Sequence, residues 1–220
     1  MAKTPSRTAT KDEISQIRSA VQNGNLDGVR HLIGMGIRPD QGLEGERAVH
    51  LAADCGHAEI VQFLLDSGSN PNIKDAKGNT PLIRALTSRP KRESLHQGAN
   101  ESAMRLLMNN ADANELSERK QHAFTLAAKR ASYEVVETMA RSGAIDSEQM
   151  DAALLMAAGR GDIRIVNLLI DAGARANSAD SSGTTPLHVA AGQKNGCVHS
   201  IFSMLPQLCR VNPPERHGDH

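Results

Sequence analysis

The chain has 220 residues, and its 25 basic and 25 acidic side chains give zero formal charge at pH 7, which argues against nucleic-acid or membrane binding driven by bulk electrostatics. Its three cysteines cannot build a disulfide framework, so we expect a reducing, cytoplasmic environment. Residues 1–11 are basic but lack the apolar core of a secretory signal, and the longest apolar run, Ala152–Ala158, is too short to span a bilayer.

Apolar residues recur along the chain in pairs of short helices with a period close to 33 residues. Small residues in each first helix allow close packing between neighbours, and apolar pairs mark one face of each second helix. A residue suited to positive φ then ends that second helix. The first-helix alanines are Ala20, Ala52, Ala85, Ala127, Ala157 and Ala190, and the helix-ending residues are Gly36, Gly68, Asn110, Gly143 and Gly173.

The first unit begins with a capping helix, and the third unit combines a clear turn signal with an insertion. Residues 1–12 are expected to be a disordered tail, after which a charged first helix caps the stack. The third unit begins Asp75-Ala-Lys-Gly-Asn-Thr-Pro-Leu-Ile-Arg-Ala, in which Gly78 suits a tight turn and Thr80 and Pro81 suit a helix start. An insertion near residues 89–100 contains Pro90 and is predicted to be an exposed loop between two helices.

The last three units depart from this pattern to different degrees. The fourth has Lys120 where the turn glycine is expected, and the fifth begins with a shortened turn, so both turns are predicted to be less regular. The sixth restores the pattern as Asp180-Ser-Ser-Gly-Thr-Thr-Pro-Leu-His-Val-Ala. Residues 206–220 are expected to form a flexible tail.

The Thr-Pro-Leu-His-like segments, the paired glycine columns and the period together resemble the ankyrin-repeat family. The resemblance implies an all-α ankyrin-repeat solenoid of about six helix-turn-helix units with short β-turn connections, over residues 13–205. It also implies that His50 and His188 brace the turns by binding neighbouring backbone. Cys55 and His57 flank Gly56, but such adjacency is not the geometry of a catalytic pair. We therefore expect no enzymatic activity, no cofactor and no metal site.

The resemblance implies that the turns and first helices bind another protein. The expected partner-binding residues are Glu44, Glu46, Lys77, Asn79, Arg84, Arg119, Lys129, Arg130 and Arg160. Among these, Arg84, Lys129, Arg130 and Arg160 are hypothesised, with the inserted loop, to recognise an acidic patch. The alternative is that these charges only solvate a long surface.

The expected function is a non-catalytic adaptor, inhibitor or immunity-type protein that is monomeric by itself. Two alternatives are a secreted microbial effector that targets a host protein and a regulatory subunit of an enzyme. Neither nucleic acid nor a membrane is expected as a partner, since charge is balanced and stacking aromatics are scarce.

Overall fold

The computed structural model describes residues 8–40, 42–43, 46–88, 93–142 and 145–192. The chain divides into two compact units, Met1–Leu126 and Ala127–His220, and the boundary falls within helix α7 (Ala123–Arg130). The described elements of the first unit before α7 are α1 (Lys11–Gln22), α2 (Leu26–Gly34), β1 (Gly42–Leu43), β2 (Glu46–Arg47), α3 (Ala48–Cys55), α4 (Ala58–Asp66), α5 (Pro81–Thr87) and α6 (Glu93–Met108). Those of the second unit after α7 are α8 (Tyr133–Arg141), α9 (Ser147–Arg160), α10 (Ile163–Asp171) and α11 (Pro186–Ala191).

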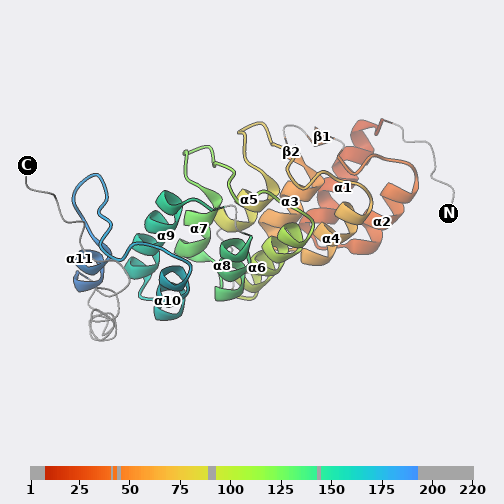
Figure 1. Cartoon of the computed structure of the whole chain (residues 1–220). Helices are drawn as coiled ribbons and strands as arrows, with labels where there is room; N and C mark the ends of the chain where they lie inside the picture. The colour runs from red at the N-terminus through yellow and green to blue at the C-terminus, as the bar shows by residue number, and fades with distance from the viewer. Residues whose placement is uncertain (1–7, 41, 44–45, 89–92, 143–144, 193–220) are drawn as a thin grey trace, which may run out of the picture. The chain divides into compact units, whose positions relative to one another are not determined.

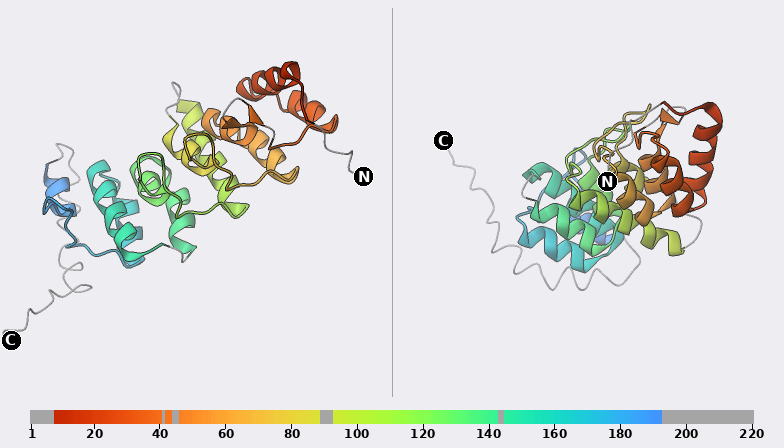
Figure 2. Two further views of the ribbon diagram at one scale, coloured as in Figure 1. Left: turned by 90° about the horizontal axis from the view of Figure 1, so that it is seen from above. Right: turned by 90° about the vertical axis from the view of Figure 1, so that its right-hand side faces the viewer.

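Helices of the first unit form two rows. The first helices α1, α3 and α5 contact one another in sequence order, and the second helices α2, α4 and α6 do the same (Figure 1). Each first helix also packs against the second helix of its own pair, so every pair is a two-helix layer (Figure 2). In the second unit, α9 contacts α10 and α11, and α10 contacts α8.

The predicted all-α fold of helix-turn-helix units is therefore confirmed. Between α2 and α3, β1 and β2 form a two-residue antiparallel ribbon, with Gly42 opposite Arg47 and Leu43 opposite Glu46. This ribbon lies in an extended turn, where the sequence pattern predicts a short connection. The second helix of the sixth unit lies outside the described residues.

The described ends of the second helices follow the predicted column, whereas Gly143 lies outside the described residues. Gly68 has φ 96°, and the amides of Gly68 and Ser69 bind the Leu65 and Leu64 carbonyls at 2.9 and 3.0 Å. Asn110 has φ 63° and replaces glycine at the equivalent point after α6. A residue in the left-handed region allows the amides that follow the helix to bind its last carbonyls, after which the chain changes direction.

The core consists of the residues that the periodicity selected. Leu64 and Leu106 in the first unit and Met139 and Leu169 in the second are completely inaccessible to solvent. The first-helix alanines from the second unit onward, such as Ala52, are buried as well; α3, for example, packs against α1, α4 and α5. Small side chains let these helices approach closely, which explains how a core can form with few aromatic rings.

Residues 93–100 are helical, so the prediction of an exposed loop over 89–100 was wrong for this part. Helix α6 has 16 residues, whereas α4 has 9, so the insertion lengthens the second helix of the third unit at its amino-terminal end. Pro90 precedes the helix and does not interrupt it; residues 89–92 lie outside the described residues. The helix is supported on one side by α3, α4 and α5, and this support outweighs the polar composition of its first turns.

Order at the amino terminus begins earlier than predicted. Helix α1 begins at Lys11, and Thr10 and Glu13 form a capping box, with 2.8 Å between the Thr10 amide and the Glu13 carboxylate. The disordered tail predicted for residues 1–12 was therefore wrong for residues 10–12. Residues 1–7 and the predicted tail at 206–220 lie outside the described residues. The Thr10-x-x-Glu13 spacing is itself a helix-start signal, which could have placed the boundary.

Candidate functional site

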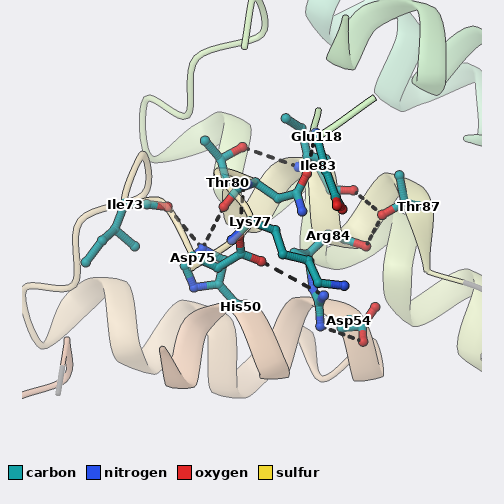
Figure 3. A network of polar contacts seen from close by, with 11 residues as sticks. His50, Asp54, Ile73, Asp75, Lys77, Thr80, Ile83, Arg84, Thr87 and Glu118 are labelled. Carbon is teal, nitrogen blue, oxygen red and sulfur yellow. Dashed lines mark hydrogen bonds and ion pairs between the residues drawn. The ribbon is translucent and has the colours of Figure 1, made fainter. Parts of the chain in front are cut away.

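The turn before α5 is built around the buried side chains of His50 and Asp75. His50 lies on α3, and its Nε2 is 3.0 Å from the Ile73 carbonyl oxygen and 3.1 Å from that of Asn79 (Figure 3). Asp75 accepts hydrogen bonds from the backbone amides of Lys77 and Asn79, both at 2.9 Å. His50 therefore braces the turn, as the resemblance implied. His188 also binds neighbouring backbone, because its Nδ1 accepts a 3.2 Å hydrogen bond from the Thr185 amide as part of a capping box at the start of α11.

Burial lowers the pKa of His50 below 6.5, because a charged imidazolium loses its hydration there, and the Arg84 charge acts in the same direction. Asp75 and the two carbonyls oppose this shift but do not overcome it. The ring already donates from Nε2, so a second proton would go to Nδ1, which is buried and has no hydrogen-bond partner among the described residues. His50 is therefore held in its neutral form.

We expect the protein to lose stability as the pH falls below about 6.5. The unfolded chain takes up a proton at His50 near that pH, whereas the folded chain does so only at lower pH, so acid favours unfolding. Urea unfolding at pH 7.5 and 5.5 measures the slope, and His50→Gln should reduce it. His31→Gln, which removes an exposed histidine from α2, is the control. An unchanged slope in His50→Gln would contradict this assignment.

Arg84 is held by acidic residues of its own chain. Its guanidinium lies 3.1 Å from Asp54 on α3 and 3.9 Å from Asp75 in the turn (Figure 3). Asp75 is almost completely buried, and 22% of the Arg84 side chain is exposed. The prediction that Arg84 recognises an acidic patch on a partner is therefore not supported by its surroundings, because its charge joins α3, α5 and the turn.

Asn79 is also committed to the scaffold, contrary to its prediction as a partner-binding residue. It is 7% exposed, and its side-chain oxygen accepts a 2.9 Å hydrogen bond from the Glu118 amide in the following turn. Its backbone carbonyl oxygen lies within reach of His50. Asn79 therefore links two successive turns, and little of its side chain is left for a partner.

Arg160, at the end of α9, is likewise bound inside its unit. Its Nη1 donates to the Ala131 carbonyl at 2.6 Å, and its Nη2 lies 3.7 Å from Asp162. A cation beside a carbonyl that follows the end of a helix is electrostatically favourable. Its prediction as a partner-binding residue is therefore weakened, because the guanidinium has a structural role.

The remaining predicted positions divide between the two units. Lys77 and Arg119 lie exposed in turns of the first unit, whereas Lys129 and Arg130 lie exposed at the end of α7 in the second. Glu44 lies outside the described residues, and Glu46 belongs to β2, but its side chain is not described. For these six residues, partner binding stays a prediction.

The fourth turn is regular, although the sequence predicted otherwise. The Lys120 amide binds the Ser117 carbonyl at 2.8 Å and the Ser117 amide binds the Gln121 carbonyl at 2.9 Å. The turns at Asp75–Asn79 and Asp180–Thr184 have the same two bonds. The regularity is possible because Lys120 adopts φ 55°, where the other turns have Gly78 and Gly183. The missing glycine is a sequence signal that points to Lys120, a residue absent from the predicted partner-binding set.

The repeat geometry agrees with a family comparison. The model of ankyrin repeats, in three copies, matches residues 17–95 and 146–208, more than half of the chain. The chain belongs to the ankyrin-repeat family. In this family, repeats serve as protein–protein interaction modules.

The curated relatives that match this chain are much larger proteins, and the match covers only part of each. Mouse Rabankyrin-5 is 29% identical over 187 residues, which cover 81% of this chain but 15% of that protein. L-asparaginase of Dirofilaria immitis is 26% identical over 180 residues, which cover 80% of this chain and 23% of the enzyme. The chain thus spans a small part of the length of these relatives.

A solved structure shares the ankyrin fold over most of the chain. It contains the predatory endopeptidase Bd0816 from Bdellovibrio bacteriovorus in complex with the immunity protein Bd3460. A chain of that complex matches with a TM-score of 0.70 and 22% identity, and the match covers 90% of this chain and 99% of that one.

Two further properties concern the described part of the ankyrin chain. Its helices include none that is both long and apolar enough to cross a membrane. Its histidine, cysteine, aspartate and glutamate residues form no group of three or more that could hold a metal ion.

Proposed function

We propose that this chain is a non-catalytic ankyrin module that binds another protein through its turns and the exposed ends of its first helices. The observation that carries the proposal is that some polar residues of this surface are bound within the chain and others are not. Arg84, Asn79 and Arg160 hold the scaffold together, whereas Lys77 and Arg119 are exposed and have no hydrogen bond or ion pair from their side chains to a described residue. Exposed charges without a structural role are available for recognition.

The polar contacts around His50 support a binding role over a catalytic one. The imidazole is fully buried and its Nε2 faces two backbone carbonyls, so it cannot reach a substrate (Figure 3). The match to L-asparaginase covers 23% of that enzyme and does not bring its activity to this chain. Binding therefore remains the function that the geometry supports best.

Within this function, we favour a protein that blocks its partner, of the inhibitor or immunity type. The solved complex with the shared fold contains an endopeptidase and an immunity protein, which provides a precedent for this role in the fold. Affinity capture with the tagged chain, followed by mass spectrometry, would identify the partner. If the captured protein is an enzyme, its activity with and without added chain distinguishes a blocking protein from an adaptor.

Reversing the charges of Lys129 and Arg130 to glutamate should weaken binding of the captured partner by about 10-fold or more if these residues lie in the interface. Both side chains are exposed at the end of α7, so the fold should remain intact. Calorimetry with the purified partner measures the affinity, and circular dichroism verifies the fold.

The matched control reverses Arg141 and Arg164, two exposed cations on second helices of the same unit. The net charge changes equally in both double variants, so a difference between them reports position. Unchanged affinity in the Lys129/Arg130 variant would exclude this part of the surface as the contact.

A further inference from the structure

Lys120 has a backbone conformation that lysine rarely adopts. Its φ is 55°, in the left-handed region where a side chain crowds the backbone. The equivalent residues of the other two regular turns are Gly78 at 79° and Gly183 at 76°. Glycine is thus the residue that this turn favours, and lysine at this position destabilises the folded state.

Within the described part of the chain, no contact of its side chain explains why lysine occupies this position. The Lys120 side chain is exposed and has no hydrogen bond or ion pair with any described residue. A Cβ atom placed on Gly78 or Gly183 would have no atom within 4 Å, so a side chain here extends into open space. Strained residues that have no structural role tend to occur at functional sites.

The two turn tips of the third and fourth units place further cations near Lys120. These tips are joined by the hydrogen bond from the Glu118 amide to Asn79, at 2.9 Å, and below them Lys74 pairs with Glu115 at 2.9 Å. Lys77 and Arg119 are exposed on the joined tips, and their side chains also have no partner among the described residues. Other cations of the first unit, such as Arg84 and Arg105, have carboxylate partners.

The local charge of the tips is positive. Glu118 is the exposed carboxylate of these two tips, and Asp75 is buried and bound to backbone amides and Arg84. The exposed positive charges of the two tips therefore outnumber their exposed negative charge. We name these three cations, Lys77, Arg119 and Lys120, the turn-tip cluster. All three belong to the first unit.

We propose that the turn-tip cluster binds an acidic segment of the partner protein and that Lys120 determines this specificity, an inference that rests on the proposed protein-binding function. An acidic polypeptide provides several carboxylates at the spacing of successive residues, and lysine and arginine recognise carboxylates by charge-assisted hydrogen bonds. Single-stranded nucleic acid is the less suitable ligand, because its binding relies on exposed aromatic rings, and Phe124, the nearest aromatic residue in sequence, is fully buried.

The test uses the full chain and two fluorescent probes, a glutamate-rich dodecapeptide and a thymidine oligonucleotide of equal charge, at low salt. We expect the peptide to bind, and Lys120→Gly to weaken it by about 3- to 10-fold. The same variant should raise Tm by about 2–4 °C, because glycine relieves the strained backbone. A residue with only a structural role would not weaken binding while increasing stability.

Two control variants separate charge from fold. Lys120→Arg keeps the charge and should keep the affinity for the peptide. Arg30→Gln removes an exposed cation from α2 and should change the affinity less than 2-fold, because that charge lies far from the turn-tip cluster. The inference is overturned if the peptide does not bind, if Lys120→Gly binds it as tightly as the unmodified chain, or if the oligonucleotide is the tighter ligand. A captured partner whose affinity depends on Lys129 and Arg130 but not on Lys120 would refute this inference and leave the proposed function standing.

Discussion

Replacing Leu64 by alanine should lower the free energy of unfolding by about 2–5 kcal/mol. Leu64 lies on α4 and is completely inaccessible to solvent, and α4 packs against α2, α3 and α6. Because α4 packs against helices of three successive layers and Leu64 is fully buried, we expect the cavity left by its truncation to collapse only partly. Urea unfolding followed by far-UV circular dichroism measures the loss.

Met108→Ala is the matched control for this core substitution. Met108 is also a large apolar residue on a second helix, but it is 70% exposed, so its truncation should cost less than about 0.5 kcal/mol. If the two variants lost similar stability, the burial of Leu64 would not explain its effect. Hydrogen exchange would also show whether the loss is concentrated in α2, α4 and α6, as expected when each layer contacts only its neighbours.

Replacing Gly98 by alanine should also destabilise the protein, by about 1–3 kcal/mol, although alanine normally favours a helix. A Cβ atom on Gly98 would clash with the carbonyl oxygen of Gly56, the residue that ends α3. That obstacle is backbone and cannot rotate away, so α6 would have to move. Thermal and urea unfolding of the variant measure the effect.

Gly34→Ala provides a control of opposite sign. Gly34 is at the end of α2, and a Cβ atom there would have no atom within 4 Å, so alanine should stabilise the helix by about 0.5–1 kcal/mol. The same chemical change is thus expected to have opposite effects at two helical glycines. Stabilisation at both positions would show that α6 does not approach α3 closely at Gly98.

Much of the fold could be predicted from the sequence because it depends on local periodicity. Residues such as Leu64 and Leu106 recur on one helical face, and a left-handed residue follows second helices such as α4 and α6, at Gly68 and Asn110. These signals depend on neighbours three or four positions away, so they are present in the sequence itself. The length of α6 was missed because its support comes from α3, α4 and α5, which a local pattern does not include.

The candidate site was harder to predict, because the position of a charged residue in the sequence does not show whether its side chain forms an ion pair within the chain. Arg84 and Lys77 both fall in the third unit, but Arg84 lies beside Asp54 and Asp75, while Lys77 is exposed. Asn79 similarly was expected at a turn tip, and its side chain instead joins the next turn. These outcomes depend on contacts about thirty or more residues apart.

The sequence by itself determined the helix-turn-helix repeat and the residues of its core. The period, the columns of small residues and the left-handed helix ends all depend on residues that are close together in the sequence. Only the tertiary structure decided which cations are engaged and which are exposed, and that Lys120 takes the conformation of a glycine. The physical reason is that ion pairs form when separate segments are packed together, and that the φ of Lys120 depends on how its turn closes between Ser117 and Gln121. A repeated local pattern fixes what each layer is, whereas the contacts between layers fix what remains available on its surface.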